Sequence, residues 1–261
     1  MQPTQGQGKD GPVRTAYRLL HARHGRLGWW PGRTRLEIVA GAILTQNTAW
    51  ANAAKAVGNL RSAGWLRLPG LRAAGEDRIA AAVRPSGYYR QKARKLKAFV
   101  ALLDRDFGGS LRRMALTPTG ELRQALLATW GIGPETADSI LLYAFGRPVF
   151  VVDAYTLRVA SRHGWVPEGT GYDALQAYFA ARLPADAALL NDYHAQMVWV
   201  GKHHCRPRPR CAGCPLAPLL PAGGIRRRSG EGEGEGKSVA PPDAPRRRAA
   251  RPCARRRPQR T

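Results

Sequence analysis

The sequence of 261 residues predicts an all-α fold, and three observations favour it. Apolar residues recur at helical spacing, as Leu36, Val39, Ala40 and Ile43 do. The segments with this spacing are separated by Gly, Pro, Ser, Thr and Asp, which begin and end helices. Only 149–152 resembles a strand, and the sequence offers no second run to pair with it. Apolar residues make up 44% of the chain, enough for a hydrophobic core.

Residues that begin or end helices define the bounds of each predicted helix along the chain. Thr45–Thr48 separates the first two, because such side chains bond to nearby backbone. Pro85 ends a short helix, and Ser86 is expected to cap a long basic one. Gly146 and Gly164 are expected C-caps. The predicted helices are 36–44, 49–62, 79–83, 88–107, one beginning at 117–118, 134–145, 153–163, 172–182 and 189–203.

The charge of the chain is strongly positive, since 42 Lys and Arg against 18 Asp and Glu give +24. A protein this basic usually binds a polyanion, most often nucleic acid. No apolar run approaches the ~20 residues of a membrane helix. Residues 1–10 lack the apolar segment of a signal peptide. We therefore expect a cytoplasmic protein that lies with the DNA of a bacterial nucleoid.

Segment 226–261 is expected to be a disordered basic tail. Gly, Pro and Arg dominate it, and it has almost no large apolar residues to offset its ordering entropy. Its Arg runs would attract phosphate through counterion release. A solvated tail without a specific role is an equally good interpretation.

The most informative stretch is 126–163, where a helix is followed by Gly131-Ile132-Gly133 and a second helix. Two glycines at this spacing let the backbone turn sharply and approach a partner closely. The N–H groups of Gly131, of Gly133 and of the first turn around Thr136 lack helical partners, which suits a DNA phosphate. A tight turn between two packed helices is the alternative.

Asp153 follows Gly133 by 20 residues, and this segment resembles the helix–hairpin–helix, Gly/Pro-rich loop and catalytic Asp of the endonuclease III family of DNA glycosylases. Leu44–Thr48, Pro85–Ala93 and a group of cysteines resemble the family in the same order, over about residues 15–220. The resemblance implies two helical subdomains with the DNA-binding cleft between them. The expected parts are an N-terminal segment 1–35 packed on the C-terminal subdomain, a helical subdomain 36–148 with the hairpin, a C-terminal subdomain 149–225 with the cysteine loop, and the tail 226–261.

Within this resemblance Asp153 is the expected catalytic residue, although a plain helix N-cap is the simpler interpretation. Family members that also cut the strand carry a Lys two residues after the second hairpin glycine, where this chain has Glu135. A carboxylate cannot form a Schiff base. The sequence therefore predicts a monofunctional enzyme in which Asp153 stabilises an oxocarbenium-like sugar and promotes attack by water.

Aromatic residues indicate the substrate. Trp29-Trp30-Pro31 upstream, Trp50 after the loop and Glu135 resemble the 3-methyladenine DNA glycosylase branch, which removes alkylated purines. Aromatic rings stack on an extruded base and attract a cationic one. We expect these residues to form the base pocket; core packing is the alternative. The other tryptophans, Trp65, Trp130, Trp165 and Trp199, are expected in the core.

The loop with Gln46 and Asn47 resembles the segment that enters the DNA in this family. A polar side chain there can fill the space left by the extruded base and bond to its former partner. Capping of a helix by Asn47 is the alternative. Gln46, Asn47, Gly131, Gly133 and Thr136 are thus the expected DNA contacts.

The cysteines Cys205, Cys211 and Cys214 resemble the family's loop for a [4Fe–4S] cluster, but Leu220 stands where the fourth Cys is expected. Four interpretations remain: a cluster completed by Cys253, a cluster or zinc completed by His203 or His204, a cluster with an open iron, or no metal.

The predicted function is therefore a DNA repair glycosylase whose partner is duplex DNA with a damaged base, acting as a monomer. Two alternatives remain. One is a bifunctional endonuclease III-type glycosylase/AP lyase acting on oxidised pyrimidines, which borohydride trapping would reveal. The other is a noncatalytic helix–hairpin–helix module, which would release no base.

Overall fold

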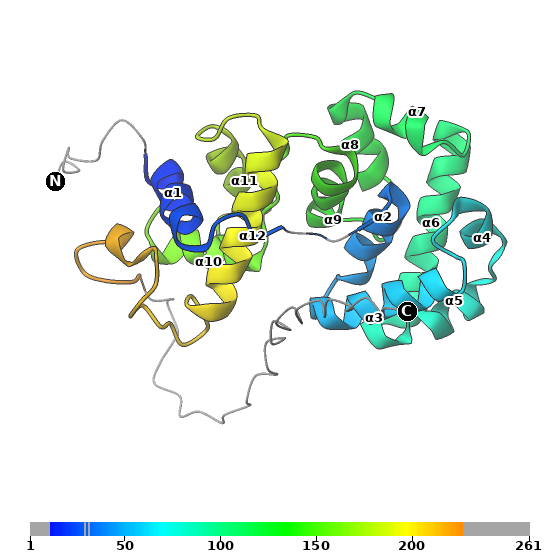
Figure 1. The fold of residues 1–261 in the computed structure, drawn as a ribbon. Helices are drawn as coiled ribbons and strands as arrows, with labels where there is room; N and C mark the ends of the chain where they lie inside the picture. Colours follow the sequence, from blue (N-terminus) through cyan, green and yellow to red (C-terminus); the bar gives the residue numbers. More distant parts are fainter. Residues whose placement is uncertain (1–10, 29, 31, 227–261) are drawn as a thin grey trace, which may run out of the picture. The chain divides into compact units, whose positions relative to one another are not determined.

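The computed structural model describes residues 11–28, 30 and 32–226, and all regular structure within these residues is helical (Figure 1). The predicted all-α class is confirmed. The helices are α1 (Pro12–His24), α2 (Arg35–Leu44), α3 (Trp50–Ser62), α4 (Leu68–Ala73), α5 (Glu76–Ala82), α6 (Tyr89–Phe107), α7 (Leu111–Leu116), α8 (Thr119–Leu127), α9 (Pro134–Ser139), α10 (Ala154–Arg162), α11 (Tyr172–Ala180) and α12 (Ala187–His203).

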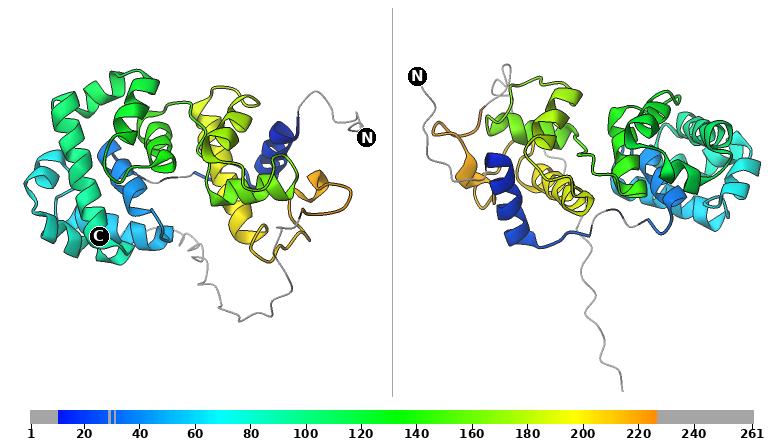
Figure 2. Two further views of the ribbon diagram at one scale, coloured as in Figure 1. Left: turned by 180° about the vertical axis from the view of Figure 1, so that it is seen from behind. Right: turned by 90° about the horizontal axis from the view of Figure 1, so that it is seen from above.

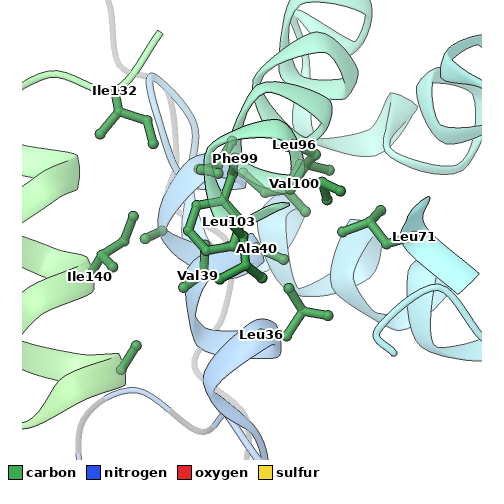
Figure 3. Packing of buried hydrophobic residues seen from close by; sticks show 14 of the residues in the cluster. Leu36, Val39, Ala40, Leu71, Leu96, Phe99, Val100, Leu103, Ile132 and Ile140 are labelled. Carbon is green, nitrogen blue, oxygen red and sulfur yellow. The ribbon is translucent and has the colours of Figure 1, made fainter. Parts of the chain in front are cut away.

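A first hydrophobic core is built around α2 and α6. Leu103 of α6 packs with Val39 and Ala40 of α2, and Leu71 and Ile140 come from other segments (Figure 3). α5 and α6 pack extensively along each other (Figure 1). This core holds α2 in place, and the loop that follows α2 is thereby fixed at its N-terminal end.

A second core joins α1, α10, α11 and α12. Phe150 stacks on Phe179, and the buried Tyr193 of α12 contacts both rings. α10 and α12 pack closely (Figures 1 and 2). α1 contacts α12, and Tyr193 donates a hydrogen bond to the carbonyl of Val13.

The predicted helix 134–145 is divided in two. α9 ends at Ser139, and a π-helical turn, Ile140–Ala144, follows it. Ile140 belongs to the first core, whereas Tyr143 belongs to the second. π-turns inside helices are frequent at functional sites. Within this turn, Leu142 and Tyr143 contribute to the second core.

Some local expectations were wrong. Ser86 does not cap α6: its hydroxyl donates to Val83 O within a 3₁₀ turn, Arg84–Ser86, and Tyr88 in a left-handed conformation begins α6 instead. As expected, the run 149–152 has no partner strand among the described residues; it is largely buried, and Gln176 donates a hydrogen bond to the carbonyl of Phe150. α1, α4 and α7 were not predicted. Within the described residues no helix has the length and hydropathy of a membrane span.

Candidate active site

The hairpin between α8 and α9 depends on Gly131. Its φ is +81°, which side chains rarely adopt. A Cβ there would also lie 2.5 Å from the Lys95 side chain. Ile132 N–H donates to Thr129 O, whereas among the described residues no acceptor is found for the N–H groups of Gly131 and Gly133. These donors are therefore available to an anion.

The loop after α2 is docked on this hairpin. The Gln46 side-chain amide donates to Gly131 O at 3.0 Å and to Thr136 Oγ1 at 2.8 Å. Lys95 Nζ donates to Gln46 Oε1. Asn47 is exposed, with a φ of +52°. The structure thus brings together Gln46, Gly131 and Thr136, three of the residues that the sequence singled out for DNA contact.

A buried lysine supports the same loop. Lys92 of α6 is 1% exposed, and its Nζ donates to Leu44 O at 2.9 Å and Ser86 O at 2.6 Å. Burial, and then the charge of Lys95, lower the pKa of Lys92 to about 8. Lys92 therefore fixes the C-terminal end of α2. Sequence reasoning did not predict this burial, since a lysine in a basic helix gives no sign of it.

Asp153 is the N-cap of α10, and its carboxylate is nearly buried, with 12% of the side chain exposed. Oδ1 accepts hydrogen bonds from Thr156 N at 2.7 Å and Thr156 Oγ1 at 2.9 Å. Oδ2 lies 3.7 Å from His194 Nε2, which is an electrostatic contact too long for a hydrogen bond. Burial alone would raise the pKa of Asp153, but His194 and the bonds from Thr156 lower it. The carboxylate is therefore ionised at neutral pH.

Glu135, in the first turn of α9, lies near Asp153. Its side chain reaches solvent, yet partial loss of hydration and then the charge of Asp153 raise the pKa of Glu135, while His194 opposes the shift. The site thus holds two carboxylates of different proton affinity, the Asp153 pKa being lowered and the Glu135 pKa raised.

Three aromatic side chains form a group that is connected to Asp153 through His194. The Trp30 ring lies flat on Tyr143, with centroids 4.7 Å apart and an interplanar angle of 10°. Trp50 is tilted against Trp30 at 5.1 Å. Tyr143 Oη is hydrogen-bonded to His194 Nδ1. The predicted pocket residues Trp29 and Pro31 lie outside the described residues, and sequence reasoning missed Tyr143 and His194.

The prediction that Trp130 lies in the core was wrong. It is 46% exposed at the hairpin, and the Arg94 guanidinium covers its ring at 4.3 Å. A cation–π contact stabilises an aromatic ring that is not buried. The remaining tryptophans, Trp65, Trp165 and Trp199, are partly buried against the two cores.

The three cysteines line one small pocket, but its donors do not fit a four-thiolate cluster. Leu220 forms part of its wall at the position of the fourth ligand, and the other lining residues include His163, His204, Pro209, Ala217 and Ile225. Burial raises the pKa of the Cys214 thiol, and the neighbouring Cys211 and Cys205 add to the shift. Within residues 11–226, apart from 29 and 31, no group of three or more His, Cys, Asp or Glu could hold a metal. Cys253 lies outside the described residues.

Two arginines of α10 bind the backbone of the cysteine loop. Arg162 is 2% exposed and donates to the carbonyls of Arg206 and Pro207, the latter at 2.9 Å. Arg158 donates to Cys205 O at 2.6 Å and Gly201 O at 3.0 Å. These bonds connect the loop to the second core.

Replacing Arg162 with Met is expected to lower the free energy of unfolding by about 2–3 kcal/mol, because buried charge-assisted hydrogen bonds are lost. Arg158→Met, at a more exposed guanidinium, is the matched control and should have a smaller effect. Urea unfolding with and without a chelator measures both. Stability that falls when chelator is added to the wild type would contradict a loop held by arginines.

A profile of the HhH-GPD superfamily of base excision DNA repair proteins matches residues 40–185, more than half of the chain. A protein of Methanocaldococcus jannaschii named "Putative DNA repair glycosylase MJ1434" is 42% identical over 202 residues, which cover 77% of this chain and 91% of the relative.

Two solved structures are similar. The H. pylori 3-methyladenine DNA glycosylase MagIII, bound to 1,N6-ethenoadenine, has a TM-score of 0.62 and 29% identity, over 72% of this chain and 97% of that one. An endonuclease III in a noncovalent complex with DNA has a TM-score of 0.68 over 80% of this chain and 93% of that one. At 22% identity, the second similarity shows the fold.

Proposed function

Since the chain belongs to the HhH-GPD superfamily of base excision DNA repair proteins and is a DNA glycosylase, we propose that it hydrolyses the N-glycosidic bond of an alkylated purine in duplex DNA. The observation that carries this proposal is the aromatic group Trp30, Tyr143 and Trp50, which is connected to Asp153 through His194. The resemblance to the endonuclease III family predicted from the sequence is confirmed. The alkylated purine as substrate is what the proposal adds to membership of the family.

The chemistry assigned to Asp153 follows from its ionised state. The bond between C1′ and the base nitrogen breaks, and its electron pair leaves with the cationic alkylpurine, which becomes neutral. The Asp153 carboxylate stabilises the oxocarbenium-like sugar. Water adds to C1′ and transfers its proton to Asp153, which releases it to solvent. The product is an abasic sugar in an intact strand.

The base would stack on the aromatic group. An electron-rich ring face attracts an alkylated purine that carries positive charge. The similar H. pylori enzyme is described as a 3-methyladenine glycosylase and was solved with 1,N6-ethenoadenine, which supports a purine substrate here. Trp29 and Pro31 remain proposed members of this pocket on the sequence alone.

The proposed DNA contacts are the loop and the hairpin. The N–H groups of Gly131 and Gly133 would bind a phosphate. Gln46, or the exposed Asn47, would fill the space left by the base. Gln46 must then exchange its bonds to Gly131 and Thr136 for bonds to DNA. A protein with this substrate would lie with the DNA in the cytoplasm.

Product strands are expected to remain uncut until alkali or heat is applied, because Glu135 stands where a strand-cutting enzyme has its Lys. Of the amines nearby, Lys92 is buried on two carbonyls and Lys95 is bonded to Gln46. The measurement is a panel of duplexes, each with one lesion, scored for base loss with and without alkali.

The controls in that panel separate the alternatives. Glu135→Lys is the matched variant, and borohydride trapping shows whether the introduced amine forms a Schiff base. Strand cleavage by the wild type at its rate of base loss would contradict the monofunctional assignment. Release of oxidised pyrimidines in preference to alkylpurines would contradict the substrate class.

A further inference from the structure

Tyr143 and His194 connect the aromatic group to the Asp153 carboxylate. Trp30 stacks on Tyr143, Tyr143 Oη bonds to His194 Nδ1, and His194 Nε2 faces Asp153 Oδ2. A continuous series of contacts therefore joins the proposed base-stacking face to the carboxylate.

The imidazole of His194 lies between two fixed partners. Its side chain is 7% exposed and projects from α12, which the second core holds rigidly. Tyr143 comes from the π-helical turn and is itself packed under Trp30. A ring whose two nitrogens face different partners has its orientation determined by both.

The Asp153 carboxylate is correspondingly held at both oxygens. Thr156 of its own helix bonds Oδ1, while His194 of α12 faces Oδ2. A carboxylate held only at Oδ1 would remain free to rotate about the bond to Cβ. Contact from a second helix restricts that rotation, so that the charge stays next to the reacting sugar.

We propose that His194, oriented by Tyr143, is a positioning residue for the glycosylase reaction, fixing the Asp153 carboxylate from the side of α12. The proposal rests on the role assigned to Asp153 in the proposed function. His194 touches neither the sugar nor the base in this role, and it acts through Asp153.

The pKa of Asp153 is a measurable quantity that would not change if His194 had only a structural role. Burial raises the Asp153 pKa and His194 lowers it, with Thr156 on the same helix. The other carboxylate at the site is Glu135 of α9. Without His194, the effect of burial is opposed only by the bonds from Thr156, so the Asp153 pKa is expected to rise. The reaction needs the ionised carboxylate. The acidic limb of the pH–rate profile for base release should therefore move to higher pH.

Two substitutions separate the two contacts of the imidazole. His194→Asn places an amide near the Nδ1 position, which retains a partner for Tyr143 but does not reach Asp153. His194→Gln places an amide near the Nε2 position, which reaches Asp153 instead. Tyr143→Phe removes only the hydroxyl and keeps the ring under Trp30. His163→Asn is the control, because His163 is a comparably buried histidine bonded to Val159 O and Leu216 O.

In single-turnover base release, His194→Asn is expected to be about 10- to 100-fold slower than wild type, with unchanged DNA affinity. The acidic limb of its pH–rate profile should lie at higher pH than that of wild type. The same shift is expected when Glu135 is also replaced by Gln. His194→Gln should stay within a few-fold of wild type, and Tyr143→Phe should lie between them. His163→Asn should lower only the melting temperature. The proposal would be overturned if His194→Asn and His194→Gln lost the same amount of activity in proportion to their melting temperatures, with no shift of the acidic limb of the pH–rate profile.

A titration of the free protein separates this proposal from the proposed function. ¹³C NMR of the Asp153 carboxyl carbon needs no substrate, and its midpoint should be higher in His194→Asn than in wild type. Identical midpoints would overturn the role of His194. A wild type that releases no alkylpurine would instead contradict the proposed substrate.

Discussion

Replacing Asp153 with Asn is expected to lower the single-turnover rate of base release by at least about 100- to 1,000-fold while duplex affinity changes little. The amide carries no charge to stabilise the sugar cation and cannot accept the proton of the attacking water. It can still accept hydrogen bonds from Thr156, so the N-cap of α10 should be retained. Single-turnover kinetics and a binding titration with the same lesion duplex measure the two quantities.

The control for this variant is Asp186→Asn. Asp186 caps α12 through the N–H groups of Ala188 and Leu189, and its side chain is exposed. Both variants keep an N-cap, but only one removes the charge beside Glu135 and His194. If Asp153→Asn turns over within a few-fold of wild type, Asp153 acts only as a helix N-cap and the catalytic assignment is wrong.

Replacing Trp50 with Ala is expected to slow excision of an alkylated purine by about 10- to 100-fold, since base–aromatic stacking contributes about 1–3 kcal/mol. Binding to undamaged DNA should change much less. Trp30→Ala should have a similar effect on rate and a larger one on stability, because Trp30 packs against both cores and stacks on Tyr143.

The matched control is Trp65→Ala. Trp65 packs against the first core, under the Arg78 guanidinium at 5.2 Å. Its removal should lower the free energy of unfolding by about 3 kcal/mol and leave the rate per folded molecule unchanged. If Trp50→Ala behaves in the same way, the base does not stack on this ring.

Local signals were sufficient for much of the fold and for part of the site. Asp153 begins α10 as an N-cap, and the glycines of the hairpin take the turn that their spacing indicated. These features depend on residues within one helical turn, where hydrogen-bonding preferences are strong. The sequence therefore predicted most of the helices, but not α1, α4 and α7, and it predicted the order of the motifs.

Contacts between distant helices could not be predicted in this way. Tyr143 and His194 are 51 residues apart, and 140–144 has the pattern of any apolar helix, so nothing in the sequence indicates its π-helical turn. Lys92 is buried through carbonyl acceptors that only the folded chain supplies. Trp130 shows the converse, since a large aromatic residue is not necessarily buried when a guanidinium covers it.

The docked state of Gln46 bears on how the enzyme would search along DNA. Its bonds to Gly131, Thr136 and Lys95 must open before the side chain can replace a base, at about 0.5–1.5 kcal/mol each for the neutral ones. Sound pairs resist opening more than damaged ones. If Gln46 is the residue that enters the DNA, the enzyme would move over intact sequence with Gln46 still bonded to Gly131 and Thr136. Damaged and intact base pairs would then be distinguished first by how easily they open, before any purine contacts Trp30 or Trp50.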